Sequence, residues 1–168
     1  VENIIIQPSE QRRGFLDWGS FHVEPKHLTN FKNYTKSLKQ RNSLLKKSDM
    51  TNIDYWTKEV SRHGLLVHEQ RNEYFIDLNK EFISYTNKLT DFDKSVYDDI
   101  KNTKINYYKG WDKTLGLDMA LADNLNKDRA IKHTSVGPHR GDLLFSVNGK
   151  DLKNISSMST QIIISLLL

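Results

Sequence analysis

The chain has 168 residues, of which 37% are hydrophobic and 27% charged, with a formal net charge of +4 and no cysteine. This composition is typical of a folded domain, and it excludes a disordered segment, disulfides, thiolate nucleophiles and zinc sites built on thiolates. The longest apolar runs, at residues 4–6 and 162–168, are far shorter than the about 20 residues of a membrane-spanning helix, so we expect no membrane span.

The N-terminal segment lacks the motifs of a complete nucleotide hydrolase. No secretory signal follows Val1, so we expect a cytoplasmic, internal piece of a longer protein. Gly14 and Gly19 have the glycine spacing of a phosphate-binding loop, but Ser20 and Phe21 follow where Lys and Ser/Thr are needed. An apolar strand that ends in a Mg²⁺-binding acid is missing as well. We therefore expect no ATP hydrolysis by this chain alone.

Asp17, beside Trp18 and after Arg12 and Arg13, has the surroundings of a general acid or base. No nucleophile or second carboxylate stands at a recognisable spacing from it. A structural ion pair is therefore the better interpretation, and we assign no catalytic residue.

Residues 25–48 contain no acidic residue and have the period of an amphipathic helix. Apolar and small polar side chains recur at steps of three and four, at Leu28, Phe31, Thr35, Leu38, Asn42 and Leu45. The opposite surface is expected to carry Lys32, Lys36, Lys39, Lys46 and Lys47. Two interpretations of that surface stay open, a phosphate-binding face and a solvated face that keeps the helix soluble.

A longer helix is predicted after a break at residues 48–52, where Ser, Asp, Thr and Asn can cap helices. Its pattern of steps of four and three is Trp56, Val60, His63, Val67, Gln70, Tyr74, Leu78, Phe82, Tyr85 and Leu89. Because this stretch has no proline and only Gly64 as a weak breaker, we predict one helix of over thirty residues, about 50 Å long. Such a rod outgrows a globule, so the two helices are expected to form an antiparallel arm.

Shorter elements are predicted after residue 98. Residues 104–109 are expected to form a strand, and residues 115–125 an amphipathic helix. The tail at residues 156–168 changes from small polar residues to an apolar run, which suits a cap followed by a buried helix.

The clearest local signal is a β-hairpin. Asn148 and Gly149 tolerate the positive φ angles of a two-residue turn. We therefore predict antiparallel strands at residues 142–147 and 150–155.

The histidines do not have the spacing of a metal site. His63 and His68 are five residues apart on the predicted helix and point to different faces. His22 and His27 stand on either side of Pro25. We therefore predict no bound metal.

The stretch at residues 137–142 places glycine and proline around His139 and Arg140. It is either a shaped turn that presents a cation or a strand-entry turn in which Arg140 pairs with Asp142. Both interpretations stay open.

Four stretches follow the sequence of one known family in order and spacing. They are Arg-Arg-Gly-Phe-Leu-Asp-Trp-Gly with Phe-His-Val-Glu-Pro at residues 12–19 and 21–25, Leu-Lys-Gln-Arg-Asn at 38–42, Tyr-Lys-Gly-Trp at 108–111, and Thr-Ser-Val-Gly-Pro-His-Arg-Gly-Asp-Leu at 134–143. On these motifs the chain resembles the RecF family of ABC-type ATPases, which are related to SMC proteins. The resemblance covers nearly the whole chain but only the middle of the family's sequence, without its phosphate-binding lobe and Mg²⁺-binding strand.

The resemblance implies an α+β fold. A long antiparallel helical arm, the family's second lobe, would be attached to part of an ABC-type ATPase head with a β-hairpin. The chain would divide into a head-to-arm connection at residues 1–24, the arm at 25–101, and the return to the head at 102–168, with strands, the hairpin and the start of the signature helix.

The resemblance also implies a function in DNA replication and repair. The family's proteins form ATP-dependent homodimers that bind single-stranded or gapped DNA, act with RecR and RecO to load RecA, and assist SOS induction. ATP and Mg²⁺ are the family's cofactors, and this chain alone is expected to bind neither.

In the family, the helix after the hairpin opens with a Ser-x-Gly-Gln-Gln signature. Its serine and helix N-terminus meet the γ-phosphate held by the opposite subunit, because free amides and the helix dipole favour an anion. Ser159 is the best match, although the glycine and the polar residues after it are missing before Ile162. A second gap lies near residues 6–9, and Lys132 and Gly141 stand where the family usually has glycine and alanine.

These observations give the candidate sites. The candidate phosphate contacts are Arg12, Arg13, Lys36, Lys39, Arg41, Lys46 and Lys47, and each lysine would position DNA without reading bases. His139 and Arg140 are candidates for contacts at the interface between heads. An alternative is a protein-interaction arm that docks a RecR-like partner, without direct DNA contact, through Trp56, Tyr74, Phe82 and Tyr85.

Overall fold

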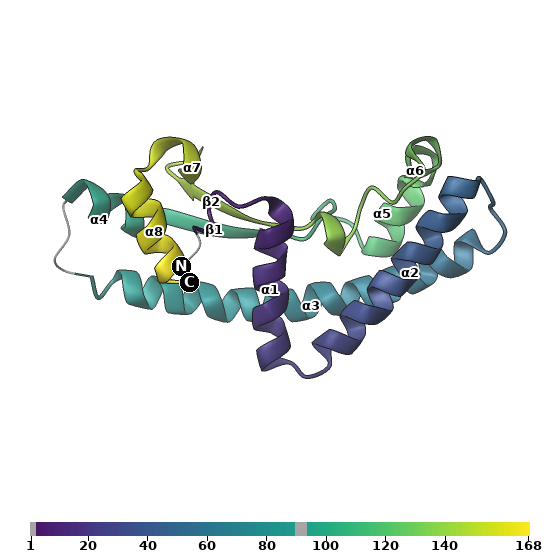
Figure 1. Ribbon diagram of the computed structural model, residues 1–168, viewed down its shortest axis with the longest axis horizontal. Helices are drawn as coiled ribbons and strands as arrows, with labels where there is room; N and C mark the ends of the chain where they lie inside the picture. Colours follow the sequence, from purple (N-terminus) through teal and green to yellow (C-terminus); the bar gives the residue numbers. More distant parts are fainter. Residues whose placement is uncertain (1–2, 90–93) are drawn as a thin grey trace.

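The longest element of the computed structural model, which describes residues 3–89 and 94–168, is the helix α3, Ile53–Thr86 (Figure 1). Its 34 residues correspond to about 50 Å of rod, which confirms the prediction of one helix of over thirty residues. Gly64 does not break it. A Cβ atom at Gly64 would lie 2.6 Å from Leu117 Cδ2 and 3.1 Å from Tyr34 Cε2, so this glycine lets two side chains approach the helix backbone closely.

The helix α2, His27–Lys47, packs antiparallel against the first half of α3 (Figure 1). The connection between them is short because Ser48 and Asn52 both adopt left-handed backbone conformations, with φ of 55° and 62°. The Ser48 N–H donates to the carbonyl groups of Leu44 and Leu45 and so ends α2. The predicted antiparallel helical arm is confirmed.

The buried face of α2 differs from the predicted stripe. Leu28, which the period places in the core, is 40% exposed, and Thr35 is exposed as well. The buried positions of α2 are His27, Tyr34, Ser37, Arg41 and Leu45. Most of these side chains carry polar atoms, so a search for apolar residues does not find them. For this reason the predicted face is displaced from the observed one by roughly one residue position.

Within the described residues the sheet has three antiparallel strands in the order β1-β2-β3. They are β1 at Thr103–Tyr108, β2 at Asp142–Val147 and β3 at Lys150–Asp151. Thr103 pairs with Val147 and Tyr108 with Asp142, so the two long strands align end to end. Buried residues alternate with more exposed ones in β2, the period of a sheet covered on one face. The strand predicted at residues 104–109 is confirmed within one residue.

Asn148 and Gly149 join β2 to β3 in the predicted two-residue turn, with φ of 49° and 76°. The second strand of the hairpin is shorter than predicted. It ends where Asp151 accepts a hydrogen bond from a following backbone N–H and caps the short helix α7, Leu152–Ile155. The prediction of a strand over residues 150–155 is therefore wrong after its first two residues, because a capping aspartate starts a helix there.

The remaining helical segments flank the sheet and the arm. They are α1 (Ser9–Val23), α4 (Lys94–Lys101), α5 (Leu117–Asp123), α6 (Leu125–Ile131), the 3-10 helix η1 (Pro138–Arg140) and α8 (Met158–Leu166). Neither α1 nor α4 is among the predicted elements, and the helix predicted at residues 115–125 is two short helices that meet at Asn124. Among the described residues, no helix combines the length and the apolar character needed to cross a membrane.

The tail helix α8 has the predicted cap, since the Ser157 side chain accepts a hydrogen bond from the Thr160 N–H. It is buried on one side only. Ile164 is fully buried, whereas Ile162 is 39% and Leu166 58% exposed. The prediction of a buried tail helix is therefore correct for only part of its surface.

Two apolar cores lie along α3. The first, beneath the sheet, contains Ile5, Leu16, Phe82, Ile100, Ile105, Leu143, Phe145, Val147, Leu152 and Ile164. The second, between α2, α5 and α3, contains Tyr34, Val60, Val67, Trp111, Leu117, Ala120 and Leu121. Because α3 contributes side chains to both cores, it connects the arm to the sheet (Figure 1). The predicted α+β architecture, a helical arm attached to a part with a β-hairpin, is confirmed.

Candidate functional site

The lysines of α2 form one exposed stripe, which we call the lysine face. Lys32, Lys36 and Lys39 are exposed, and so are Lys46 and Lys47 further along the helix. At about 100° per residue, all five fall within roughly 100° around the helix axis. Among the described residues, none of them forms an ion pair with a carboxylate. The lysine face therefore presents unneutralised positive charge along most of α2.

A shallow groove lies along the lysine face. It has a volume of about 440 Å³ and is lined by Thr35, Leu38, Lys39, Asn42, Ser43 and Lys46. Two ammonium groups thus share a concave surface with hydroxyl and amide side chains. Lysines act as point charges toward phosphate oxygens, and hydroxyl and amide groups donate hydrogen bonds to them. The groove therefore has the chemistry of a site for a phosphate backbone.

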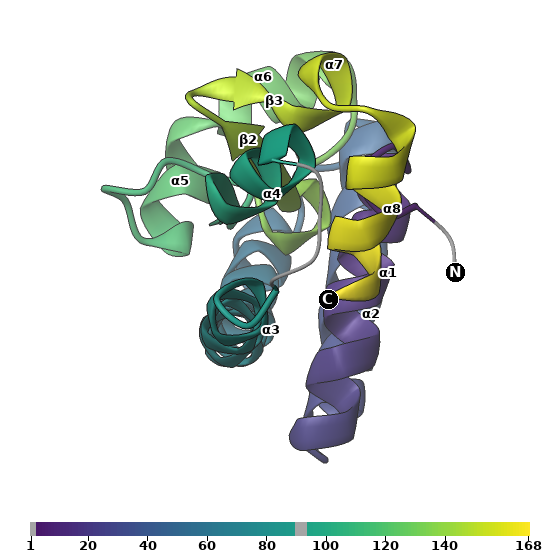
Figure 2. The same ribbon diagram turned by 90° about the vertical axis from the view of Figure 1, so that its left-hand side faces the viewer.

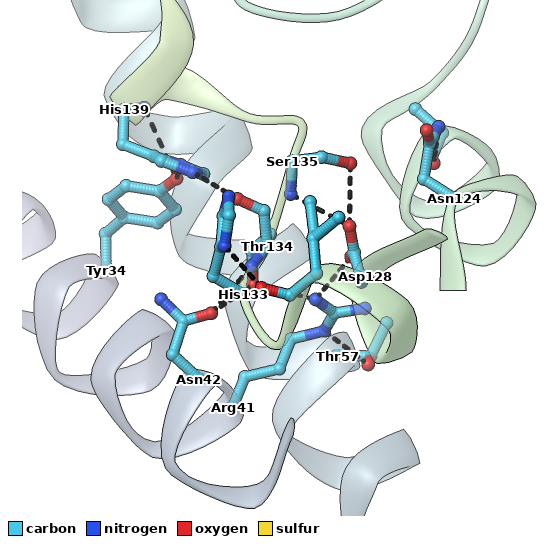
Figure 3. Close-up of polar contacts among 12 residues, drawn as sticks. Tyr34, Arg41, Asn42, Thr57, Asn124, Asp128, His133, Thr134, Ser135 and His139 are labelled. Carbon is cyan, nitrogen blue, oxygen red and sulfur yellow. Dashed lines mark hydrogen bonds and ion pairs between the residues drawn. The ribbon is translucent and has the colours of Figure 1, made fainter. Parts of the chain in front are cut away.

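Arg41 lies on the opposite side of α2 and is completely buried. Figure 3 shows its polar contacts. Roughly 180° around the helix separate Arg41 from Lys32. Its Nη1 donates to Asp128 Oδ2 and to Thr134 Oγ1, each at 2.7 Å. Its Nε donates to Thr57 Oγ1 at 3.0 Å. Arg41, a predicted phosphate contact, is thus not exposed to a ligand, because a carboxylate inside the protein neutralises its guanidinium.

The same network holds the loop that leads from α6 into β2. Asp128 Oδ1 accepts hydrogen bonds from the Ser135 N–H at 2.9 Å and from its hydroxyl at 2.6 Å. Asn42 Oδ1 accepts from the Thr134 N–H at 2.8 Å and from its hydroxyl at 2.7 Å. The helix α6 thus binds Ser135, and α2 binds the neighbouring Thr134 (Figure 3). These contacts fix the position of α2 relative to the strand that follows the loop.

His139 lies in the same loop and is neutral. Its Nε2 is 3.0 Å from the Thr134 carbonyl oxygen, which can only accept, so Nε2 carries the proton. Its Nδ1 then accepts from the Tyr34 hydroxyl at 2.7 Å (Figure 3). Burial lowers the pKa of His139 from 6.5 to about 4. Of the two candidate residues for an interface between heads, His139 is therefore held in the loop, and the exposed Arg140 presents its charge outward.

Arg12 and Arg13 connect α1 to the start of β2. Arg12 Nε and Nη2 donate to the two carboxylate oxygens of Asp142 at 2.8 Å and 2.7 Å. Arg13 Nη1 donates to the Gly141 carbonyl oxygen at 3.0 Å. Both predicted phosphate contacts are thus engaged within the protein, and neither joins the lysine face. The interpretation in which Arg140 pairs with Asp142 is wrong, because Arg12 occupies that carboxylate.

Asp17 joins three helices. Arg71 of α3 donates to its two carboxylate oxygens through Nε at 2.7 Å and Nη2 at 2.8 Å. His27 of α2 is also a partner, with Nε2 3.0 Å from Asp17 Oδ1. Burial alone would raise the pKa of Asp17, but the hydrogen bonds from His27 and Arg71 lower it below its usual value. The predicted structural ion pair of Asp17 is confirmed, with a distant arginine as its partner.

The two glycines with the spacing of a phosphate-binding loop lie in a helix. Gly14 and Gly19 both lie inside α1, and the Tyr74 ring covers Gly19 so closely that a Cβ atom there would lie 2.0 Å from Tyr74 Cζ. Gly19 is thus required for helix packing, and no phosphate-binding loop forms at these glycines. In the part of the chain that the structure describes, no group of three His, Asp or Glu side chains could hold a metal ion.

Ser159 lies exposed in the first turn of α8. Two residues earlier, Ser157 caps this helix, since its hydroxyl accepts from the Thr160 N–H at 3.1 Å. The structure therefore places Ser159 at a helix N-terminus, as its predicted role requires. It does not bring Ser159 near the lysine face, because α8 and α2 lie toward opposite ends of the molecule (Figure 1).

The aromatic side chains of the alternative docking arm do not share one face. Phe82 is 2% exposed and belongs to the first core. Trp56 stands in the first turns of α3, near the tip of the arm. Tyr74 and Tyr85 line a common groove beside α1. Of the four residues predicted to dock a partner, only Tyr74 and Tyr85 therefore share a surface.

Two charged residues with structural importance are not among the predicted sites, Arg71 and Asp128. The sequence does contain a signal for Arg71. It follows Val67 by four residues and precedes Leu78 by seven, so the helical period places this charged residue on the buried stripe of α3. Asp128 has no comparable local signal. Its partner Arg41 is 87 residues away in the sequence, so only the tertiary structure pairs them.

The chain is similar to known proteins in sequence and in fold. It is 34% identical over 152 residues to the DNA replication and repair protein RecF of Pseudomonas syringae pv. tomato and to that of Pseudomonas putida. Both matches cover 89% of this chain but only 39% and 40% of the relatives, so the chain spans about two fifths of the length of the curated relatives it matches. The solved structure of the recombination mediator protein RecF-ATP in the RecFOR pathway superposes with a TM-score of 0.82 at 23% identity, over 98% of this chain and 46% of that one. No family model matches the chain.

Proposed function

Because the chain belongs to the RecF family of DNA replication and repair proteins, we propose that it contributes a DNA-contacting surface to a RecF-type protein. That surface is the lysine face of α2. The observation that carries the proposal is its row of exposed lysines, none of them neutralised by a carboxylate among the described residues. The groove that contains Lys39 and Lys46 adds hydroxyl and amide groups to the same surface.

The dimensions of the lysine face suit a nucleic-acid backbone. From Lys32 to Lys46 it extends about 21 Å along α2, which corresponds to roughly six phosphates of one strand at 3.4 Å each. Lysine ammonium groups attract phosphates without a geometry that distinguishes bases. We therefore expect binding that depends strongly on salt and weakly on sequence.

The buried networks give this surface a fixed position. Arg41 binds the loop before β2 from the side of α2 that faces away from the lysines, and Asn42 binds it from the edge of the groove. A DNA strand on the lysine face would thus contact a helix whose orientation relative to the sheet is set by hydrogen bonds in the interior. Binding would need little rearrangement of α2.

For the whole protein we propose the role that the family implies. It would bind single-stranded or gapped DNA as an ATP-dependent homodimer in the cytoplasm, act with RecR and RecO to load RecA, and assist SOS induction. Ser159 at the start of α8 would contact the γ-phosphate held by the opposite subunit, since free N–H groups at a helix N-terminus favour an anion. ATP and Mg²⁺ would be held by other segments of the whole protein. The role proposed for the whole protein is supported by the similarity to RecF proteins in sequence and to the ATP-bound structure in fold.

The salt dependence of DNA binding tests the proposal. The affinity of the chain for a fluorescein-labelled single-stranded oligonucleotide would be measured by anisotropy at several salt concentrations, before and after the triple substitution Lys36→Ala, Lys39→Ala and Lys46→Ala. We expect the slope of log K against log salt to decrease in magnitude by about 2, because each lost phosphate contact removes roughly 0.7 from it.

A matched triple variant controls for net charge. Lys58, Lys127 and Lys150 are exposed lysines outside α2, and changing all three to alanine removes the same charge from other surfaces. We expect this control to keep nearly the slope of the unmodified chain. An unchanged slope in the α2 variant, or equal changes in both variants, would remove the lysine face from the DNA site.

A second candidate function is a protein-interaction arm that docks a RecR-like partner without direct DNA contact. It is favoured by the groove that Tyr74 and Tyr85 line together. Capture of such a partner by the chain in a pull-down, together with the absence of measurable DNA binding, would favour this function over the first.

A further inference from the structure

A second concave surface is lined by residues of α1, of α3 and of the segment after α8. Figure 2 shows the arrangement of these helices. The surface has a volume of about 410 Å³, and its lining includes Val23, Glu73, Tyr74, Asp77, Glu81 and Tyr85. We call it the acidic groove. It lies on a different helix from the lysine face, so the two surfaces are separate in structure as well as in charge.

The floor of the acidic groove is apolar. Val23 at the end of α1 is 64% exposed, and Tyr85 on α3 is 48% exposed. Between them, Tyr74 and the mostly buried Leu78 continue the apolar surface, and Leu167 and Leu168 line it from the C-terminal side. Contiguous exposed apolar side chains with a polar rim are typical of interaction surfaces.

The charged side chains that line the acidic groove are all carboxylates, and Lys88 is a neighbouring cation, with Nζ 5.3 Å from the centre of the Tyr85 ring. Glu73, Asp77 and Glu81 follow one another at steps of four on α3, where like charges repel and destabilise the helix. Glu24 adds a carboxylate just after α1, and among the described residues no lysine or arginine lines the groove. The ion pair of Asp77 with Lys80, at 3.0 Å, is largely exposed, so it relieves little of this repulsion.

This local charge contrasts with the chain as a whole, which has a net charge of +4. Among the described residues, no cation forms an ion pair with Glu73 or Glu81. A partner that brought positive charge to the rim and apolar side chains to the floor would relieve the repulsion and cover the exposed Val23 and Tyr85 in one step. The charge of the rim therefore specifies the charge of the partner.

We propose that the acidic groove docks a basic amphipathic helix of a partner protein. From Glu73 to Tyr85 the groove follows α3 for about 18 Å, which matches roughly three turns of a helix lying beside it. Leucine-like side chains at steps of three and four would enter between Val23 and Tyr85, and flanking lysines or arginines would reach the carboxylates. This inference gives the chemistry of the partner for the groove of the second candidate function, and it stands whether or not the lysine face binds DNA.

Other occupants fit this surface less well. The phosphates of a nucleic acid or of an anionic membrane would be repelled by the carboxylates of the rim. The basic helix of a second copy, α2, supplies lysines, but Leu28 is the only large hydrophobic side chain of its described residues that is as much as 40% exposed. That single side chain is not enough to fill the apolar floor. A basic helix with a full apolar stripe is the occupant that both features require.

A designed peptide tests the proposal directly. The probe is a fluorescein-labelled, amidated leucine–lysine peptide of about 15 residues with its leucines on one helical face. A scrambled peptide of identical composition serves as its control. We expect the whole chain to bind the amphipathic peptide at least about tenfold more tightly than the scrambled one in an anisotropy titration.

Variants of the chain locate the binding. Glu73→Lys with Glu81→Lys is expected to weaken binding of the amphipathic peptide about tenfold. The control pair, Asp118→Lys with Asp123→Lys, makes the same charge change on exposed positions of α5 and is expected to alter the affinity by less than about twofold. Tyr85→Ser, at a half-exposed position, tests the apolar floor without a charge change and is also expected to weaken binding.

Three results would overturn the proposal. The first is equal weakening by the groove pair and the control pair, with melting curves that show all variants folded. The second is equal affinity for the amphipathic and scrambled peptides. The third is concentration-dependent dimerisation of the unmodified chain, measured by sedimentation and abolished by Tyr85→Ser, which would make the groove an interface between copies.

Discussion

The two sides of α2 carry cations that do different things. On one side Lys36, Lys39 and Lys46 are exposed to solvent without a carboxylate partner, whereas on the other Arg41 is enclosed and bound to Asp128 at 2.7 Å. Both sets come from one 21-residue helix that contains no acid. The position of a cation around the helix, together with a partner distant in the sequence, therefore decides whether its charge is available to a ligand.

The two sets also differ in what they contribute energetically. An exposed lysine contributes little to folding, because water already solvates its charge. A buried arginine and aspartate depend on each other, since removing one leaves the other charged and without compensation. Substitutions on the two sides of α2 should therefore separate into effects on stability and effects on DNA binding.

The largest expected effect is on the buried side. Arg41→Ala should reduce the free energy of unfolding by about 3 to 5 kcal/mol, because Asp128 then remains buried without its ion pair. Urea denaturation followed by circular dichroism measures this change. The double variant Arg41→Met with Asp128→Leu should recover part of the loss, although the Ser135 donors lose their acceptor. A loss below about 1 kcal/mol in Arg41→Ala would contradict the structural role of Arg41.

A smaller effect is expected from acid. Burial lowers the pKa of His139 to about 4, so between that value and about 6.5 the unfolded chain binds a proton that the folded chain does not. The stability that neutral His139 contributes is therefore present above pH 6.5 and is lost as the pH falls toward 4. Between pH 7 and pH 5 the chain should lose about 1 to 2 kcal/mol more stability than His139→Gln.

The control for this acid effect is His133→Gln, a partly exposed histidine of the same loop. It removes an imidazole from the same loop and leaves the contact of His139 with Tyr34 in place. Equal acid sensitivity of the chain and of His139→Gln would mean that His139 is not the group that takes up the proton.

The smallest effect on folding is expected on the exposed side. Lys39→Ala should change the free energy of unfolding by less than about 0.5 kcal/mol, yet it should reduce the salt slope of DNA binding by roughly 0.7. Measuring both quantities on one protein sample separates the two sides of α2. A marked loss of stability in Lys39→Ala, without a change in the salt slope, would contradict the assignment of DNA binding to the exposed side of α2.

The sequence predicts the elements whose signals are local. The steps of three and four from Trp56 onward predict α3, and Asn148 with Gly149 predicts the hairpin turn. The exposed lysines of α2 follow from the same kind of reasoning, because the helical period places Lys32, Lys36 and Lys39 together. These features depend on neighbours within one or two turns, so they need no knowledge of the fold.

The features that the sequence does not predict depend on distant partners. Arg41 has the charge and the neighbours of a phosphate contact, and only Asp128 and Thr134, brought beside it by the fold, show that it is a buried residue. Gly19 has the spacing of a phosphate loop, but the Tyr74 ring explains it as a packing residue. The stripe predicted for α2 is correct at Phe31, Leu38 and Leu45. It is wrong at Leu28 and Thr35 for the same reason, since polar side chains such as Ser37 take part in the buried face.

The most direct test of the lysine face uses the fact that the chain has no cysteine. Single cysteines introduced as Lys39→Cys and Lys46→Cys, and as Lys58→Cys and Lys150→Cys for comparison, would carry a maleimide photocrosslinker. Each labelled protein would then be irradiated with a single-stranded oligonucleotide. DNA contact along α2 predicts crosslinks at positions 39 and 46 in several-fold higher yield than at positions 58 and 150. Equal yields at all four positions, or higher yields at 58 and 150, would contradict it.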